Sequence, residues 1–177
     1  MKNPTTKPPI FAELSWTEYY LWLAMAASVR SKDPSSHVGA VVVKGSSVVT
    51  GYNGFPKGVQ DLKHRWERPT KYDFVAHAER NALDNANFDV TGAKIYVTHY
   101  PPCNECAKSI IQRGISEVIC GDWILSANTL EQSEKSFLML SEARIQITSV
   151  PATRIYMKAM KIIKENIETH RGMKHGK

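Results

Sequence analysis

Two short stretches of the sequence carry side chains that can together hold a metal ion. One contains His77 and Glu79, and the other contains Cys103 and Cys106. One imidazole and two thiolates suit a tetrahedral zinc ion that keeps its fourth position for a water molecule. Glu79 follows the imidazole by two residues, so it can reach that fourth position and act as a general base without binding the metal. The set therefore predicts a catalytic zinc site.

The two cysteines are spaced for one face of a helix. The sequence predicts a helix that Cys103 opens, and residues three apart on a helix are neighbours. The positive end of a helix and a bound cation both favour the thiolate form of cysteine. Because two thiolates cancel the charge of zinc, its Lewis acidity is weaker than at an all-histidine site. Proton transfer by Glu79 is therefore expected to matter more.

Two alternatives to a catalytic zinc stay open. A purely structural zinc would need a fourth protein ligand, and the candidates are His64, His99 and Cys120, none of which has supporting spacing. A Cys-x-x-Cys pair alone could be redox-active, but the accompanying His-x-Glu argues against that role. Cys120 ends an apolar run, so we expect a buried, inert thiol there.

Composition indicates a globular protein with no membrane segment. The chain has 177 residues, of which 42% are hydrophobic, and no apolar run approaches the ~18–20 residues of a membrane span. Three cysteines do not suggest a disulfide framework, and no signal peptide is recognisable, so we expect a cytoplasmic protein. The net charge of +6 lies largely in the two ends. By itself it is weak support for nucleic-acid binding.

The chain is expected to form one domain over residues 15–170, between an irregular arm over 1–14 and a basic tail over 171–177. Ser15 and Glu18 form a capping box, which predicts a helix that ends near Arg30. An apolar stripe on this helix is expected to pack in the core, and its members are Tyr19, Trp22, Leu23, Ala26 and Val29.

Alternating strand and helix patterns follow. In chain order they are a hairpin over 37–53, a helix over 76–88, a strand over 94–100, a helix over 103–114, a strand over 117–122, a helix over 127–141, a strand over 144–150 and a helix from Pro151. Residues 59–73 show no clear periodicity and are expected to be an excursion that returns at Phe74. The alternation predicts an α/β fold, a mixed sheet covered by helices.

Several stretches together resemble the zinc-dependent deoxycytidylate (dCMP) deaminases of the cytidine/deoxycytidylate deaminase superfamily. His-x-Glu followed by Pro-Cys-x-x-Cys is the signature of zinc-dependent nucleobase deaminases. Here the two motifs read His-Ala-Glu-Arg-Asn-Ala at 77–82 and Pro-Cys-Asn-Glu-Cys-Ala-Lys at 102–108. The dCMP branch is indicated by Ser-Lys-Asp-Pro at 31–34, Val-Gly-Ala-Val-Val at 38–42 and Gly-Tyr-Asn-Gly-Phe-Pro at 51–56.

The resemblance runs from about Trp16 to Asp122 and implies a three-layer cytidine-deaminase-like fold, with a five-stranded mixed sheet in the order 2-1-3-4-5. It implies hydrolysis of dCMP to dUMP and ammonia, which supplies dUMP for thymidylate synthesis. It also implies a homohexamer with dCTP as activator, dTTP as inhibitor and Mg²⁺ on the effector nucleotide. One alternative is a polynucleotide deaminase acting on tRNA adenosine or single-stranded cytosine, against which the dCMP-type stretches argue. The other is a non-catalytic, zinc-stabilised nucleotide-binding protein.

Carried over residue by residue, the resemblance assigns His77, Cys103 and Cys106 to zinc and Glu79 to the proton shuttle. The implied substrate contacts are Asn53 with the deoxyribose hydroxyl, the Ala78 backbone with the pyrimidine carbonyl, Arg30, Ser31 and Lys32 with the phosphate, and Trp123 as a wall of the pocket. The implied effector loop is Asn53, Gly54, Phe55 and Pro56. A solvated helix end is the alternative role for Arg30 and Lys32.

Two features depart from the family's pattern. Pro101 and Pro102 lengthen the approach to Cys103 by one residue, so we expect a small bulge beside the zinc ligands. Family members often have a tyrosine after the fourth strand that meets the substrate phosphate. This chain has Trp123 in that region, and its indole is a poorer phosphate partner.

Overall fold

Five strands form one mixed sheet, in the order β2-β1-β3-β4-β5 that the family resemblance implied. The computed structural model describes residues 13–99, 101–122 and 127–174. The strands are β1 (Gly39–Lys44), β2 (Ser47–Tyr52), β3 (Lys94–Val97), β4 (Glu117–Gly121) and β5 (Gln146–Val150). Strand β1 is antiparallel to both β2 and β3, whereas β3, β4 and β5 are parallel.

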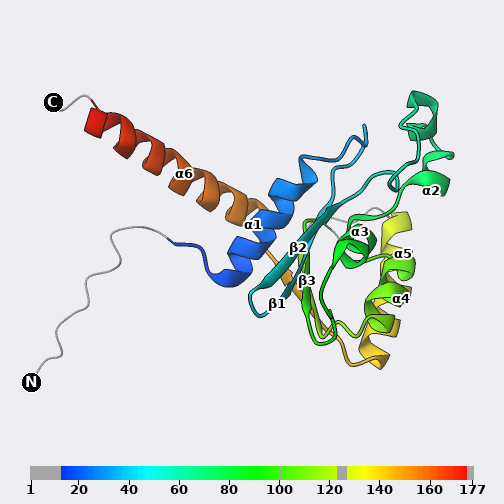
Figure 1. Cartoon of the computed structure of the whole chain (residues 1–177). Helices are drawn as coiled ribbons and strands as arrows, with labels where there is room; N and C mark the ends of the chain where they lie inside the picture. Colours follow the sequence, from blue (N-terminus) through cyan, green and yellow to red (C-terminus); the bar gives the residue numbers. More distant parts are fainter. Residues whose placement is uncertain (1–12, 100, 123–126, 175–177) are drawn as a thin grey trace, which may run out of the picture.

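Helices cover both faces of this sheet, which makes three layers (Figure 1). The helices α1 (Trp16–Ser28) and α6 (Ala152–Lys174) lie on one face. The helices α3 (Ala78–Asn85), α4 (Asn104–Gln112) and α5 (Ala127–Glu142) lie on the other. Because strand side chains alternate between faces, Ala40 and Val42 pack under α3, while Val41 packs under α1.

Two glycines meet backbone requirements of the β1–β2 hairpin, and one of them allows close packing next to the candidate site. Gly45 has φ 58° in the two-residue turn between β1 and β2, a left-handed conformation that glycine adopts without strain. A Cβ on Gly51 would lie 2.3 Å from the backbone nitrogen of Ala82. The bare backbone of β2 therefore lets α3 approach closely, and α3 begins at the candidate metal site.

The predicted apolar face of α1 is partly wrong. The capping box is present, since the Ser15 amide donates to Glu18 Oε2 at 2.7 Å and the Glu18 amide donates to Ser15 Oγ at 3.3 Å. The residues of α1 that are fully buried are Leu21 and Ala24. Tyr19 is 39% exposed, and Val29, just beyond the helix, is 76% exposed. The side of α1 that faces the sheet is rotated from the stripe, so the stripe's aromatic residues lie at the edge of the interface with α6.

The excursion over residues 59–73 is an ordered cap beside the sheet. It contains a 3-10 helix, η1 (Lys63–Trp66), and leads into a single turn, α2 (Lys71–Phe74). The Trp66 ring stacks on Phe55 with centroids 4.1 Å apart. After α2 the chain rejoins the body where Gly54 and Ala76 exchange two backbone hydrogen bonds of 3.1 and 2.9 Å.

The remaining predicted elements are present with shifted ends. Strand β3 ends at Val97, and the chain bends at Thr98 and His99. The expected bulge before Cys103 includes position 100, which lies outside the described residues. In the part of the chain that the structure covers, no helix is both long and apolar enough to cross a membrane.

Candidate active site

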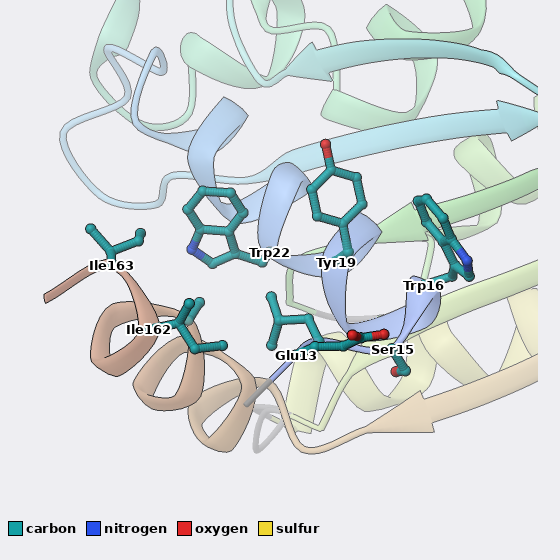
Figure 2. A pocket seen from close by; sticks show the side chains of 9 residues that line it. Glu13, Ser15, Trp16, Tyr19, Trp22, Ile162 and Ile163 are labelled. Atoms are coloured by element: carbon teal, nitrogen blue, oxygen red, sulfur yellow. The ribbon is translucent and has the colours of Figure 1, made fainter. Parts of the chain in front are cut away.

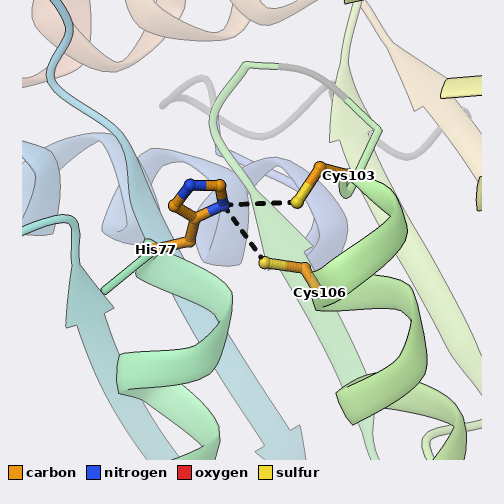
Figure 3. A group of neighbouring side chains, drawn as sticks. All are labelled: His77, Cys103 and Cys106. Carbon is orange, nitrogen blue, oxygen red and sulfur yellow. Dashed lines mark hydrogen bonds between the residues drawn. The ribbon is translucent and has the colours of Figure 1, made fainter. Parts of the chain in front are cut away.

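The predicted metal-binding residues meet where two helices begin. His77 is the N-cap of α3, with extended backbone (φ −71°, ψ 156°), and Cys103 is the N-cap of α4 (φ −67°, ψ 169°). The helix thus begins one residue after Cys103. His77 Nδ1 lies 3.3 Å from Cys103 Sγ and 3.4 Å from Cys106 Sγ (Figure 3). The three ligand atoms lie within 4.8 Å of one another.

The spacing of these atoms fits a zinc ion. With Zn–S bonds of ~2.3 Å and Zn–N bonds of ~2.0–2.1 Å, tetrahedral geometry separates a nitrogen ligand from a sulfur ligand by about 3.6 Å. The two nitrogen–sulfur distances, 3.3 and 3.4 Å, come close to this value. Side-chain movements of a few tenths of an ångström would therefore be enough for the metal to enter.

No fourth protein ligand joins this group within the described ranges. His77, Cys103 and Cys106 form the one cluster of histidine, cysteine and acidic groups there that could hold a metal ion. Cys120 is buried in the apolar core between the sheet and the helices α3, α4 and α5, and burial raises the pKa of its thiol to about 11. His64 is exposed in η1. A metal bound by the three residues would keep its fourth position open, as a catalytic zinc requires.

The three candidate ligand groups shift one another's pKa values. A hydrogen bond with Cys106 is the main cause that lowers the pKa of Cys103 to about 4, and a hydrogen bond with Cys103 raises the pKa of His77 to about 9. The pKa of Cys106 is raised by the neighbouring Cys103 sulfur and by burial. Cys103 is therefore the thiolate of the pair, and metal binding must displace the protons of His77 and Cys106.

Glu79 lies beside the ligands and is almost inaccessible to solvent. It is the second residue of α3, it is 6% exposed, and its side chain is in hydrogen-bond contact with Cys106. Burial raises the pKa of this carboxyl above its usual value. A raised pKa makes the protonated form of a carboxyl more accessible, which suits a group that must both accept and release a proton in general acid–base catalysis.

A cavity of about 400 Å³ opens beside these residues, and its wall also carries polar groups from other parts of the chain. Its polar and charged lining residues include His77, Glu79, Cys103, Asp33, Ser35, Ser36, Asn53, Arg68 and Lys71. A larger cavity of about 590 Å³ lies on the other face of the sheet, between α1 and α6 (Figure 2). Aromatic and aliphatic side chains dominate its wall, with Glu13 as the one ionisable carboxylate, so it lacks the groups for this chemistry.

Asn53 and Ala78, for which the family resemblance implies substrate contacts, both line the cavity. The Asn53 amide group donates to Asp33 Oδ2 (3.2 Å) and to the Ser36 carbonyl (2.9 Å), and its oxygen accepts from the Val38 amide (2.8 Å). Both amide hydrogens are thus committed, while the oxygen keeps a second lone pair. Ala78 is the first residue of α3, so its N–H has no acceptor within the helix.

The residues that the resemblance assigned to the substrate phosphate do not line this cavity. They are Arg30, Ser31 and Lys32. Ser31 is buried and donates its hydroxyl to the Asn53 carbonyl at 2.9 Å. Lys32 forms an ion pair with Asp61 in the excursion. Trp123, the other predicted pocket residue, lies outside the described part of the chain.

Sequence reasoning missed the three charged residues that do line this part of the cavity, Asp33, Arg68 and Lys71. Asp33 stands in the Ser-Lys-Asp-Pro stretch, in which the resemblance implied roles for Ser31 and Lys32 but none for Asp33. Arg68 and Lys71 belong to residues 59–73, where no hydrophobic periodicity indicates which side chains face the cavity. The available signal was their position, because Lys71 precedes His77 by only six residues.

A metal position between two helix starts, a buried glutamate and a 2-1-3-4-5 sheet define the cytidine-deaminase-like class of zinc proteins. The chain belongs to the family described as the cytidine and deoxycytidylate deaminase zinc-binding region, whose model matches residues 14–122. That span includes both predicted metal motifs.

Relatives agree with this membership. Human deoxycytidylate deaminase is 48% identical over 115 residues, which cover 60% of this chain and 64% of that protein. The chain thus spans less than two thirds of the length of this curated relative. An uncharacterised deaminase of Aliivibrio fischeri is 40% identical over 139 residues, covering 77% of this chain and 94% of that protein. The crystal structure of the cyanophage S-TIM5 dCMP deaminase in complex with dCMP and dUMP is 27% identical, with a TM-score of 0.61 and coverage of 82% and 99%.

Proposed function

We propose that this protein hydrolyses dCMP to dUMP and ammonia. The observation that carries the proposal is the placement of His77, Cys103 and Cys106 around one metal position, with Glu79 beside it and a nucleotide-sized cavity in front. The relatives support the choice of substrate, because the curated ones include named deoxycytidylate deaminases and the similar phage structure contains dCMP and dUMP.

His77, Cys103 and Cys106 would hold the zinc ion, and Glu79 would move the protons. When bound, zinc lowers the pKa of a water molecule and so supplies a nucleophile near neutral pH. The water oxygen forms a bond to C4 of the pyrimidine, and the bond between C4 and the amino nitrogen breaks. Glu79 takes one proton from the water and gives it to ring N3, and it then moves the second proton from the new hydroxyl on C4 to the departing amine. One water is consumed for each dUMP and ammonia formed.

Asn53 and Ala78 would hold the nucleoside in place. The free N–H at the start of α3 suits the C2 carbonyl of the pyrimidine, where it would fix the depth of the ring. The remaining lone pair of Asn53 Oδ1 suits the hydroxyl of the deoxyribose. Because Asn53 is held by three hydrogen bonds, this acceptor is oriented before substrate arrives.

Other parts of the proposal rest on the sequence and on the family resemblance. Length and composition support a single domain over 15–170 and a cytoplasmic location. The resemblance supports a homohexamer, activation by dCTP with Mg²⁺, inhibition by dTTP, and an effector loop at Asn53, Gly54, Phe55 and Pro56. In this loop Gly54 is hydrogen-bonded to Ala76 and Phe55 is stacked on Trp66. An effector that moved the loop would therefore move the segment that leads to His77.

The test is ammonia release by the zinc-loaded protein from dCMP, CMP, deoxycytidine and dCTP, each with and without added dCTP or dTTP. We expect dCMP to be the preferred substrate and Glu79→Gln to abolish nearly all turnover while zinc stays bound. A protein that left dCMP intact but deaminated an oligonucleotide would be a polynucleotide deaminase. A Glu79→Gln protein with unaltered function would point to a nucleotide sensor.

A further inference from the structure

The excursion over residues 59–73 supplies two cations to the wall of the candidate active site. Arg68 and Lys71 both line the cavity that His77 and Glu79 also line. A nucleoside monophosphate carries a dianion, which needs positive charge and hydrogen-bond donors. The question is which of the cations near the cavity is free to meet it.

Lys71 is fully occupied by protein groups. Its ammonium donates to Asp33 Oδ1 (3.0 Å), Asp33 Oδ2 (2.8 Å) and Ser35 Oγ (2.7 Å). An ammonium has three N–H donors, so this side chain has none to spare. Its contribution is to cancel the charge of Asp33, a carboxylate that would otherwise repel an anion in the cavity.

Arg68 differs from the other cations near the cavity. It is exposed at the cavity wall, its guanidinium lies 5.9 Å from the Tyr72 ring centroid, and within the described ranges it forms no ion pair. Lys32 is paired with Asp61, and Arg30 lies outside the lining. Once Lys71 has neutralised Asp33, the positive charge left at this wall belongs to Arg68.

We propose that Arg68 is the residue that selects a phosphorylated substrate, by binding the 5′-phosphate of the nucleotide. The inference rests on the proposed function and assigns the phosphate to the excursion instead of the Arg30–Lys32 stretch. A guanidinium can hold two phosphate oxygens at once, and the nearby Ser36 side chain lines the same cavity. Lys71 acts as a positioning residue, because it holds the excursion against Asp33 and keeps the wall free of negative charge.

The test compares Arg68→Ala with two control variants on dCMP and on deoxycytidine, which lacks the phosphate. Loss of charge-assisted hydrogen bonds should lower kcat/KM for dCMP roughly 10- to 100-fold, mainly through KM. The deoxycytidine rate should not change, and zinc content and melting temperature should match the wild type because Arg68 is exposed. Arg154→Ala, on α6 at the opposite face of the sheet, controls for loss of one exposed arginine. Arg30→Ala tests the rival assignment.

Binding of the product gives a second readout that does not depend on a measurable deoxycytidine rate. By calorimetry, Arg68→Ala should weaken dUMP binding by roughly the same 10- to 100-fold and leave deoxyuridine binding unchanged. Equal dUMP affinity in Arg68→Ala and wild type, or the dUMP-specific loss in Arg30→Ala instead, would overturn the inference. A wild-type protein that neither deaminates dCMP nor binds dUMP would contradict the proposed function itself, whatever the variants do.

Discussion

Lys71 Nζ lies 2.8 Å from Asp33 Oδ2, and the two side chains, 38 residues apart in sequence, are almost completely buried. Asp33 also accepts from the amides of Ser35 and Ser36 and from the amide group of Asn53. The ion pair thus ties the excursion to the loop and the asparagine that form the cavity wall. Two charges that are well paired and hydrogen-bonded tolerate burial, whereas either one left alone does not.

Replacing Lys71 should destabilise the protein strongly. Lys71→Met leaves the Asp33 carboxylate buried without a counter-charge, and we expect a loss of ~3–5 kcal/mol in the free energy of unfolding, measured by urea denaturation. The double variant Asp33→Asn/Lys71→Met, which buries no charge, should recover a large part of that loss. The matched control is Lys32→Met, which removes an exposed pair with Asp61 and should cost about 1 kcal/mol or less. Similar losses for both single variants would contradict this account of the buried pair.

The same pair predicts how stability depends on pH. Burial acts to raise the pKa of Asp33, but the hydrogen bonds from Lys71 and Ser35 outweigh it and hold the pKa below the usual 3.8. A carboxyl whose folded-state pKa is lowered stabilises the fold above its unfolded pKa, and that contribution is lost as the pH falls through the folded value. Between pH 5 and the folded pKa, the wild type should therefore lose more unfolding free energy than Asp33→Asn/Lys71→Met. If the unfolding free energies of the two proteins fell in parallel over that acid range, the pair would make no pH-dependent contribution to stability.

Glu79→Gln should separate proton transfer from metal binding. The amide keeps the size of the side chain but cannot shuttle a proton, so turnover of dCMP should fall at least ~10²–10⁴-fold. Zinc content, measured by atomic absorption, should stay at the wild-type level because Glu79 is not one of the proposed ligands. Glu105→Gln is the control, since Glu105 is exposed next to Cys106 and pairs with Lys108. It should retain full activity, and a large loss there would mean that any charge change near the site is disruptive.

The residues of the candidate metal site could be predicted from the sequence because they lie at helix starts, where a short motif fixes their positions. His77 and Cys103 are both N-caps, so local backbone geometry aims them once the sheet brings the two helices together. Arg68 and Lys71 have no such local rule. Their placement depends on a non-periodic excursion held by the Phe55–Trp66 stack and by the long-range pair with Asp33. The buried face of α1 was mispredicted for a related reason, because the packing angle of a helix on a sheet is a tertiary property.

Two of the three cysteines should be zinc ligands, and the third, Cys120, should not bind the metal. Cys106→Ala removes a sulfur that lies 3.4 Å from His77 Nδ1, so we expect it to lose tightly bound zinc and, with it, dCMP turnover. Cys120→Ala should keep zinc and activity and lose only ~1 kcal/mol of stability, because its thiol lies in the apolar core on β4. Zinc content after dialysis against a weak chelator, together with ammonia release, distinguishes the two. Zinc retained by Cys106→Ala but lost by Cys120→Ala would mean that Cys120 is a ligand and that the three-residue metal site is wrong.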